Sequence, residues 1–470
     1  MFLFPQYNAK PKTDNLIWLL AEDDNLKDLK LDKNQTQFLK DALKKENMVV
    51  IHHYGVVNIY CKVENLKTDA DKEKLRVLGY KTYEALKSKC DSAHIKSDSA
   101  VALEFFVEGF ALGSYEFNKY FTKPKEQKLQ SITHNNSKAD LKKVETIVDA
   151  TLWARDLINE PVNVINAPQL AKEIVKKCKG TSIHHEVLGQ AKIEALKMGG
   201  ILAVNKGSVD EATFTILEYK PKKAKNKKPI VLVGKGIVYD TGGLSLKPTK
   251  GSMDSMKCDM SGAAAMAATL IACAKLGVNL HLVALIPATD NRPGGNAYTP
   301  GDVIKMFDGT TIEVLNTDAE GRMILADALA YAKKYKPELV IDAATLTGAA
   351  AAAIGPFASI VMGNASQKEF DALSKAGFAT HDRVVQFPFW SEYKDEMKST
   401  IADMKNVGGA YGGMITAGKF LEHFTDYPYI HIDIAGPAFT TSRDSYRGLG
   451  GTGCGVRLLV EYLSGKANGK

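Results

Sequence analysis

Downstream of about residue 165, short apolar runs alternate with alanine-rich segments, and this alternation constrains the fold more than any other feature. The apolar runs have the length of strands and lie at 229–234, 279–287, 339–343, 359–363 and 429–434. The alanine-rich segments have helical length and lie at 261–276, 323–335, 416–424 and 455–463. This alternation predicts an α/β fold with a mostly parallel central sheet flanked by helices, in which ligands bind beyond the carboxyl ends of the strands.

The chain has 470 residues, more than one hydrophobic core usually holds, so the sequence predicts two domains. We expect a smaller α/β amino-terminal domain over 1–140, an interdomain helix over 141–165 and a larger domain over 166–470. The polar, turn-rich segment 133–139 marks the first boundary. In the first domain, strand-like runs are expected at 15–20 and 48–61, and helix-like runs at 35–45, 69–88 and 100–120.

Composition excludes several classes of protein. No run approaches the roughly 20 apolar residues that span a bilayer, and the first residues, MFLFPQYNAKPK, carry no basic leader, so neither a membrane span nor a signal peptide is expected. The six cysteines are scattered without a CxxC pair, which favours a reduced, cytoplasmic setting. The densest lysine run, 220–228, is interpreted as a solvated loop between two strands. A nucleic-acid patch is the alternative, but no aromatic residues interleave with these lysines.

Three segments carry clustered chemical groups, and each is expected at or just after a strand end. They are 233–243, which is glycine-rich, 253–265, which runs into a helix of small residues, and 315–327. Their charged candidates are Lys235 and Asp240 in the first, Asp259 in the second, and Asp318, Glu320 and Arg322 in the third.

The carboxylates of these segments outnumber the basic groups. We expect the third segment to be extended, which would point Asp318 and Glu320 to the same side of the chain. Two such carboxylates repel each other unless a cation or a proton neutralises them, and Arg322 alone does not offset both. In total, four carboxylates would face two or three basic groups. A pair of divalent cations removes this imbalance.

Each segment taken alone also has a purely structural interpretation. Lys235 and Asp240 are compatible with a surface ion pair, and Asp259 with the N-cap of the following helix. Asp318 and Glu320 are compatible with a solvated turn paired with the arginine that follows. The occurrence of all three segments in one α/β domain favours the metal site.

The metal type stays open on the residues alone. None of the ten histidines lies in the three segments. A carboxylate site with one lysine suits Mg²⁺ or Mn²⁺ as well as Zn²⁺. His281 and His431 lie within strand-like apolar runs, so we interpret both as core residues.

Asn316–Arg322, NTDAEGR, resembles the signature heptapeptide of the leucyl aminopeptidase family, the di-zinc, hexameric cytosol aminopeptidases. Five further segments resemble the family in the same order, namely Trp153–Asn163, Gly234–Pro248, Met256–Ala264, Ile341–Ala349 and Ile432–Ala438, and the match at the heptapeptide extends back to Ala297. The resemblance covers roughly residues 150–465, and residues 1–140 carry no matching motif. The stretch between Lys247 and Asp259 is one residue longer than the family spacing.

The resemblance implies a ligand set for two metal ions. The tighter position would be held by Lys235, Asp240, Asp259 and Glu320. The exchangeable position would be held by Asp240, Asp318 and Glu320, so that Asp240 and Glu320 bridge both ions. Zn²⁺ is expected, with Mn²⁺ or Mg²⁺ as alternatives at the exchangeable position.

The same matching assigns the remaining roles. Lys247 would be the catalytic lysine that stabilises charge on the scissile carbonyl, and Arg322 would hold a bicarbonate that relays a proton. A coordinating Lys235 must be neutral, because ammonium has no lone pair, and burial beside two cations would depress its pKa. The residues that contact the peptide substrate would be Met256, Thr345, Leu346, Gly348, Ala435 and Ala438. Because they are small or apolar, they favour a side chain of leucine or methionine size.

The leading hypothesis is therefore a cytoplasmic, homohexameric leucyl aminopeptidase, with 166–470 as its catalytic domain and small peptides as substrates. One alternative is that the same hexamer also binds DNA through its lysines, as some relatives do. Another is a different two-metal hydrolase such as a phosphatase, although the sequence has no phosphate-cradling loop.

Overall fold

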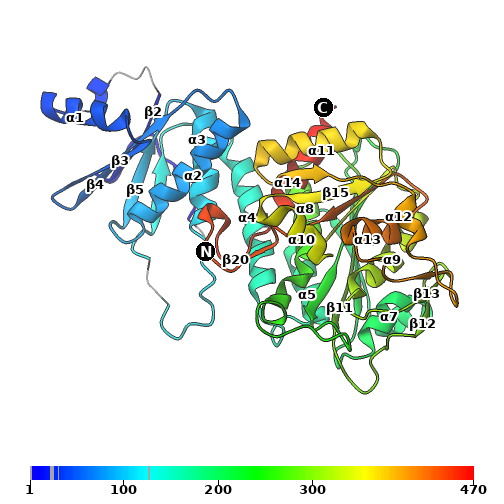
Figure 1. Cartoon of the computed structure of the whole chain (residues 1–470). Helices are drawn as coiled ribbons and strands as arrows, with labels where there is room; N and C mark the ends of the chain where they lie inside the picture. Colours follow the sequence, from blue (N-terminus) through cyan, green and yellow to red (C-terminus); the bar gives the residue numbers. More distant parts are fainter. Residues whose placement is uncertain (1–2, 22–25, 30, 125–126, 470) are drawn as a thin grey trace. The chain divides into compact units, whose positions relative to one another are not determined.

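The computed structural model describes residues 3–21, 26–29, 31–124 and 127–469. They form two compact units, one of Met1–Asp149 with Ser442–Leu449 and one of Ala150–Thr441 with Gly450–Lys470. Helix α4 (Leu141–Asn159) begins in the first unit and ends in the second (Figure 1). The segment 442–449, which we had expected within the larger domain, belongs to the first unit, where the hydroxyl of buried Tyr446 donates a hydrogen bond to Glu73 Oε1 at 2.7 Å.

The first unit is built on a six-stranded sheet with the order β1-β6-β5-β2-β4-β3. Its strands are β1 (Gln6–Tyr7), β2 (Leu16–Ala21), β3 (Met48–His53), β4 (Val56–Val63), β5 (Ser92–Lys96) and β6 (Ser131–His134). All neighbours are parallel except β3 and β4. We had expected a single run over 48–61. It is instead a hairpin, because Tyr54 and Gly55 adopt positive φ and reverse the chain.

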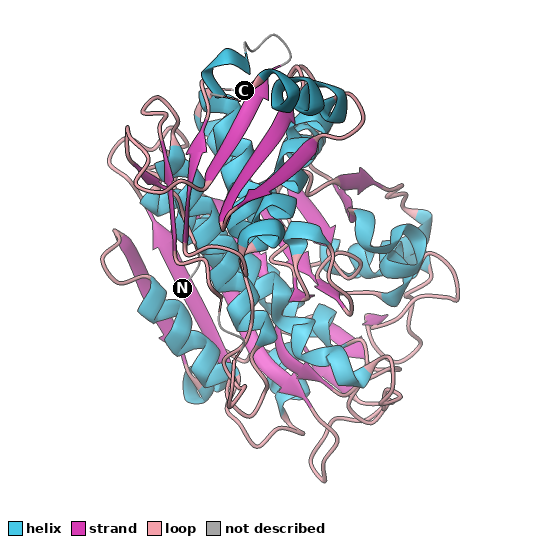
Figure 2. Ribbon diagram, turned by 90° about the vertical axis from the view of Figure 1, so that its left-hand side faces the viewer, coloured by secondary structure: helices cyan, strands magenta, loops and turns pink. Residues whose placement is uncertain are grey.

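Helices cover both faces of this sheet. They are α1 (Lys33–Leu43), α2 (Asp69–Leu86) and α3 (Ala100–Gly113). Helices α2 and α3 pack against each other and bury one core with the sheet, while α1 packs over β2, β4 and β3 in a separate cluster. Figure 2 shows the helices in cyan against the magenta strands. The first domain is therefore α/β, as the sequence predicts.

The second unit contains a nine-stranded sheet with the order β16-β15-β18-β14-β9-β11-β8-β7, and β10 pairs with β11. Its strands are β7 (Ile183–Leu188), β8 (Thr213–Tyr219), β9 (Ile230–Gly234), β10 (Gly236–Asp240), β11 (Leu282–Asn291), β14 (Leu339–Ala344), β15 (Ser359–Gly363), β16 (Val384–Gln386) and β18 (Tyr429–Asp433). The central block β18-β14-β9-β11 is parallel, and antiparallel pairs occur towards both edges. The predicted mostly parallel central sheet is confirmed.

The helices of this unit are α5 (Ala167–Lys177), α6 (Gln190–Ala195), α7 (Gly199–Asn205), α8 (Ser261–Lys275), α9 (Glu320–Ala332), α10 (Gly348–Ile354), α11 (Gln367–Thr380), α12 (Glu392–Asp395), α13 (Gly413–Glu422) and α14 (Val456–Ala467). Short strands complete it, namely β12 (Val303–Lys305), β13 (Thr311–Glu313), β17 (Met404–Lys405), β19 (Phe439–Thr440) and β20 (Gly450–Gly451). A 3₁₀ helix, η2 (Met253–Met260), leads directly into α8.

The central strands are apolar on both faces because helices cover both. Val231 and Val233 of β9 share a core with α7, α9 and α13, whereas α8 packs on the opposite face. The small residues of α8 let it approach closely, since a Cβ at Gly262 would lie 2.0 Å from the carbonyl oxygen of Ala343 in β14. Helix α14 packs on α8, and α11 packs on α14 (Figure 1).

The expectations for the lysine run and for the two core histidines are confirmed. The lysine run 220–228 lies in the loop between β8 and β9, with most of its residues exposed. All six cysteines are buried and free. His281 and His431 are both buried, with 7% and 0% of their surfaces exposed. Within the described residues, no helix is long and apolar enough to cross a membrane.

Candidate metal centre

The candidate groups gather where parallel strands of the second unit end. Lys235 follows β9 directly, Asp240 is the last residue of β10, Thr345 follows β14, and Ala435 lies just beyond β18. Neighbouring parallel strands expose their carboxyl ends at one edge of a sheet, so these positions meet in space although they are far apart in sequence.

The third segment is not extended, so this part of the sequence interpretation is wrong. Asp318 lies in a turn and Glu320 is the first residue of α9. The turn forms because the Asn316 side chain accepts a hydrogen bond from the Asp318 amide at 2.8 Å. The two carboxylates still converge: oxygen atoms of Asp240, Asp318 and Glu320 all lie within 4.8 Å of one another.

Lys235 lies at the centre of the buried part of the cluster. Its Nζ is 2.8 Å from Asp259 Oδ2 and 2.9 Å from Glu320 Oε1, and it donates a hydrogen bond of 2.9 Å to the carbonyl of Thr345. Only 3% of the residue is exposed, so the surface ion pair considered above is excluded. Gly321 makes room for this ammonium, since a Cβ there would lie 2.6 Å from Nζ.

Asp259 does not cap α8, which excludes its structural interpretation as an N-cap. It lies in η2, two residues before the helix begins, and the N-cap residue Met260 makes no side-chain cap. Instead, Oδ1 of Asp259 accepts a hydrogen bond from the Thr345 hydroxyl at 2.7 Å, while Oδ2 contacts Lys235. Asp259 is therefore directed into the cluster rather than along the helix.

Lys247 holds the outer part of the cluster. Its Nζ lies 3.0 Å from Asp240 Oδ2 and also forms an ion pair with Asp318 Oδ1. The side chain of Asp318 is 31% exposed and that of Lys247 15%, so this end of the site is open to ligands from solvent. Asp318 is thus partly solvated, but only 2% of Glu320 is exposed. The interpretation of the two residues together as a solvated turn is therefore excluded.

The buried charges do not balance. Four carboxylates, of Asp240, Asp259, Asp318 and Glu320, meet two ammonium groups, which leaves an excess of two negative charges. Burial raises the pKa of both Asp240 and Asp259, and the charge of Glu320 adds to it. Burial alone would also raise the pKa of Glu320, but Lys235 and Lys247 together outweigh it and the net shift is downward. The cluster therefore favours uptake of positive charge.

Burial lowers the pKa of the two lysines, but the carboxylates outweigh it. Asp259 and Glu320 raise the pKa of Lys235, and Asp240 and Asp318 raise that of Lys247. Both lysines are therefore charged at neutral pH in this structure. Divalent cations beside Lys235 would reverse that balance, because like charge disfavours the ammonium.

Arg322 lies behind the carboxylates, on the first turn of α9. It is 7% exposed, and its Nη1 donates a hydrogen bond of 2.8 Å to the carbonyl of Asn406. Its Nε has no hydrogen-bond partner within the described part of the chain. Burial lowers the pKa of this guanidinium to about 10. A buried, incompletely paired guanidinium is suited to holding a small anion.

Sequence reasoning missed the side chains that orient the ligands. The Asn291 amide donates to Asp240 Oδ1 at 2.8 Å and to the carbonyl of Thr317 at 2.9 Å. The Asn406 amide donates to the carbonyl of Asn316 at 2.7 Å. The signal for Asn291 was the polar triplet TDN at the end of an apolar strand, which our predicted strand stopped short of. Asn406 carries no local signal.

Of the six residues expected to contact substrate, Thr345 contacts the cluster directly, through hydrogen bonds with Lys235 and Asp259. Met256 is in η2, Thr345 and Leu346 follow β14, Gly348 opens α10, and Ala435 and Ala438 follow β18. Met256, Thr345, Leu346 and Ala435 are half-buried, Gly348 is exposed and Ala438 is buried. Asp433 ties two of these loops together, because its Oδ1 accepts hydrogen bonds from the amides of Leu346 and Ala435 at 3.2 and 3.1 Å.

Four carboxylates and two lysines thus gather beyond the carboxyl ends of the parallel strands, an arrangement suited to the divalent cations of a metal-dependent hydrolase. Residues 152–460 match the family model described as the cytosol aminopeptidase family, catalytic domain. The chain therefore belongs to the cytosol aminopeptidase family, which makes it a metal-dependent aminopeptidase and confirms the resemblance seen in the sequence.

Individual relatives agree. A probable cytosol aminopeptidase of Geobacter sp. (strain M21) is 41% identical over 415 residues, which cover 85% of this chain and 84% of the relative. A probable cytosol aminopeptidase of Chlorobaculum tepidum is 51% identical over 315 residues, which cover 66% of this chain and 62% of the relative. Among solved structures, the bottromycin maturation enzyme BotP in complex with Mn is similar with a TM-score of 0.85 and 27% identity, covering 97% of this chain and 99% of BotP.

Proposed function

We propose that this protein is a two-metal aminopeptidase that releases leucine and other apolar residues from the amino termini of peptides. The observation that carries the proposal is the convergence of Asp240, Asp318 and Glu320 within 4.8 Å, beside buried Lys235 and Asp259. Family membership supports the aminopeptidase activity, and the site supports the two-metal chemistry.

The donor set fits divalent cations. Lys235, Asp240, Asp259 and Glu320 would hold the tighter ion, and Asp318 would join Asp240 and Glu320 at the exchangeable one. Zn²⁺ is the ion we expect, and the oxygen-rich donors also suit Mn²⁺ or Mg²⁺ at the exchangeable position. When bound, two cations supply Lewis-acid activation of water and of the peptide carbonyl, and a position for the free α-amine.

The two lysines would have different roles because their surroundings differ. Lys235 is enclosed by Asp259 and Glu320 and would coordinate as the neutral amine. Lys247 lies at the open end of the cluster, where it would stay charged, polarise the scissile carbonyl and stabilise the developing negative charge.

Arg322 would bind a bicarbonate ion. Its guanidinium is buried beside the cluster and has a free donor at Nε among the described residues, which fits a small planar anion. When bound, bicarbonate supplies a base for the proton of the attacking water. Asn406 would fix the orientation of the guanidinium through its carbonyl.

The substrate pocket would be formed by small or apolar residues, which are Met256, Thr345, Leu346, Gly348, Ala435 and Ala438. Such residues offer no charged partner to the first side chain of the peptide. A preference for leucine-sized apolar side chains follows, and the adaptable methionine would widen it.

We further propose that the protein is a cytoplasmic homohexamer. The name that its relatives carry supports the compartment. Large apolar side chains on the second unit support self-association; they are Phe357, Trp390, Ile401 and Tyr411, each more than 60% exposed. The molar mass in solution, measured by light scattering, tests the assembly.

The decisive experiment is hydrolysis of leucine-p-nitroanilide before and after exhaustive chelation, with single metals added back. We expect activity to disappear on chelation and to return with Zn²⁺ or Mn²⁺. Activity that survives complete removal of metal would reject the proposal.

Site variants test the ligand assignment. Glu320→Ala should abolish turnover and lower the bound metal while the fold is retained, because it removes a bridging ligand. Glu194→Ala is the matched control, since this glutamate is exposed on α6 of the same unit. Equal turnover of Glu320→Ala and the control would reject the bridging role.

A further inference from the structure

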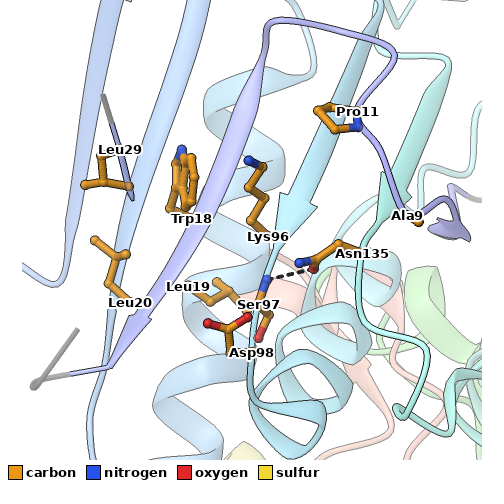
Figure 3. Close-up of a pocket in the computed structure, with 10 residues that line it drawn as sticks. All are labelled: Ala9, Pro11, Trp18, Leu19, Leu20, Leu29, Lys96, Ser97, Asp98 and Asn135. Carbon is orange, nitrogen blue, oxygen red and sulfur yellow. Dashed lines mark hydrogen bonds between the residues drawn. The ribbon is translucent and has the colours of Figure 1, made fainter. Parts of the chain in front are cut away.

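The first unit contains a pocket of about 300 Å³ that the metal centre does not use. Figure 3 shows the side chains that line it. They are Ala9, Pro11, Trp18, Leu19, Leu20, Leu29, Lys96, Ser97, Asp98 and Asn135. The volume lies at the small end of the roughly 300–1,000 Å³ that ligand pockets usually have, so the occupant is small.

The pocket lies at the switch point of the six-stranded sheet. The chain leaves β2 through α1 towards β3 and β4 on one side of β2, whereas it leaves β5 through α3 towards β6 on the other side. Connections that diverge in this way open a crevice beyond the carboxyl ends of the two strands. Three residues that line this crevice lie at or near the strand ends: Leu20 in β2, Lys96 at the end of β5 and Asp98 just after β5.

Lys96 and Trp18 form the centre of one wall. They are paired residues of parallel strands and therefore point to the same face of the sheet. The ammonium of Lys96 lies 4.3 Å from the centre of the Trp18 ring, and both side chains are half-buried (Figure 3). A cation held against an aromatic ring keeps its charge while losing part of its water, which prepares it for an anionic partner.

The pocket is also lined by an acidic residue, Asp98, and by a polar residue, Asn135 (Figure 3). Asp98 is exposed, and no described residue forms an ion pair with its carboxylate or with Lys96. Asn135 accepts a hydrogen bond from the amide of Ser97 at 3.0 Å, which fixes the loop between β5 and α3. Among the described residues, one positive and one negative group that lack an ion-pair partner thus line the same small pocket.

The rest of the lining is apolar. Leu20 is buried and Leu29 is half-buried, and both belong to the cluster under α1 that reaches Trp18. Pro11 closes the opposite edge (Figure 3). An occupant therefore needs an apolar part as well as charges.

We infer that this pocket binds a free α-amino acid with an apolar side chain. The carboxylate of the ligand pairs with Lys96, its ammonium with Asp98, and its side chain lies against Trp18 and Leu20. A simple anion leaves Asp98 unmatched, and a long peptide or dinucleotide exceeds the volume. Apolar amino acids are also the products of the reaction proposed above; that link rests on the proposed function, whereas the binding itself does not.

The test uses the full-length protein and tryptophan fluorescence during titration with L-leucine. The chain has three tryptophans, so Trp18→Phe identifies the signal of the pocket. We expect a saturable change that is absent in Trp18→Phe and requires about tenfold or more leucine in Lys96→Gln and in Asp98→Asn, because each removes one charge-assisted contact. Lys40→Gln, an exposed lysine of α1 outside the pocket, should bind leucine like the wild type.

Two analogues test the need for both charges. 4-Methylpentanoate lacks the ammonium and 3-methylbutylamine lacks the carboxylate, and each should bind about tenfold or more weakly than leucine. Equal binding of 4-methylpentanoate and leucine, or a leucine response that is the same in Lys96→Gln and wild type, would overturn the inference. Leucine-p-nitroanilide hydrolysis is measured on the same samples. If the wild type binds leucine but does not hydrolyse the substrate, only the proposed function is rejected. If it hydrolyses the substrate but shows no fluorescence response that depends on Trp18, only the pocket inference is rejected.

Discussion

Replacing Gly321 by alanine should displace the side chain of Lys235 and lower activity, while the stability of the fold changes little. A Cβ at residue 321 would lie 2.4 Å from Lys235 Cε and 2.6 Å from Nζ. Carbon atoms in contact are about 3.5 Å apart, so the end of the lysine must retreat by about 1.1 Å. Its contacts of 2.8–2.9 Å to Asp259, Glu320 and the Thr345 carbonyl then cannot all persist.

The size of the effect follows from those contacts. One charge-assisted contact contributes about 1.5–3 kcal/mol, which corresponds to about a 10–150-fold loss of kcat/KM if it serves the site. The free energy of unfolding should change less, because alanine favours a helix over glycine by up to about 1 kcal/mol and this gain offsets part of the cost of the lost contacts. We therefore expect the midpoint of thermal unfolding to fall by no more than roughly 5 °C.

The assay combines leucine-p-nitroanilide kinetics, metal content and thermal unfolding followed by circular dichroism. Gly189→Ala is the matched control, because a Cβ there meets nothing within 4 Å and its φ of −85° suits alanine. Wild-type kcat/KM and metal content in a folded Gly321→Ala variant would refute the reasoning that this glycine positions Lys235.

Three further changes have defined outcomes. Asn291→Ala removes the hydrogen bond of 2.8 Å to Asp240 and should lower kcat/KM about tenfold with little change in KM, measured by steady-state kinetics. Burial lowers the pKa of His431, but the charge of Asp342, 2.8 Å from Nδ1, raises it above its ordinary value. The stabilisation by this pair is therefore complete below about pH 6.5 and is lost as the pH rises through the folded pKa. In urea unfolding, the difference in unfolding free energy between wild type and His431→Gln should therefore shrink between pH 6 and pH 9. A difference that stays constant over this range contradicts the prediction. Gly262→Ala forces α8 away from the backbone of β14 and should cost about 3 kcal/mol or more of unfolding free energy, and a change below about 1 kcal/mol would show that the helix shifts freely.

Much of the fold could be read from the sequence because its signals are local. The apolar runs that became β9, β14, β15 and β18 are buried on both faces, so they are continuous rather than alternating. The interdomain helix predicted over 141–165 begins at Leu141 but ends earlier, at Asn159, because Pro161 cannot continue a helix. The hairpin at Tyr54 was missed because its positive φ lies on a residue that rarely adopts it.

The site was only partly readable. Lys235, Asp240, Asp259, Asp318 and Glu320 were identified by type and motif, and the structure brings them together. The geometric argument for the third segment was wrong, because a turn and a helix start, not an extended chain, direct its two carboxylates. Asn291 and Asn406 were not found, because an asparagine that orients a ligand looks the same in sequence as one in any loop.

By itself, the sequence determined the α/β class and the charged residues available for chemistry, because periodicity and residue type are properties of neighbours along the chain. The tertiary structure alone decided that Lys235 stands between Asp259 and Glu320, that Lys247 closes the outer end, and that the cluster carries an excess of negative charge. It also decided that the connections leaving the paired strands β2 and β5 run to opposite sides and leave a second pocket beyond the strand ends. The physical reason is the same in each case: parallel pairing brings strand ends from distant parts of the chain to one edge, and burial there sets the strength of every charge.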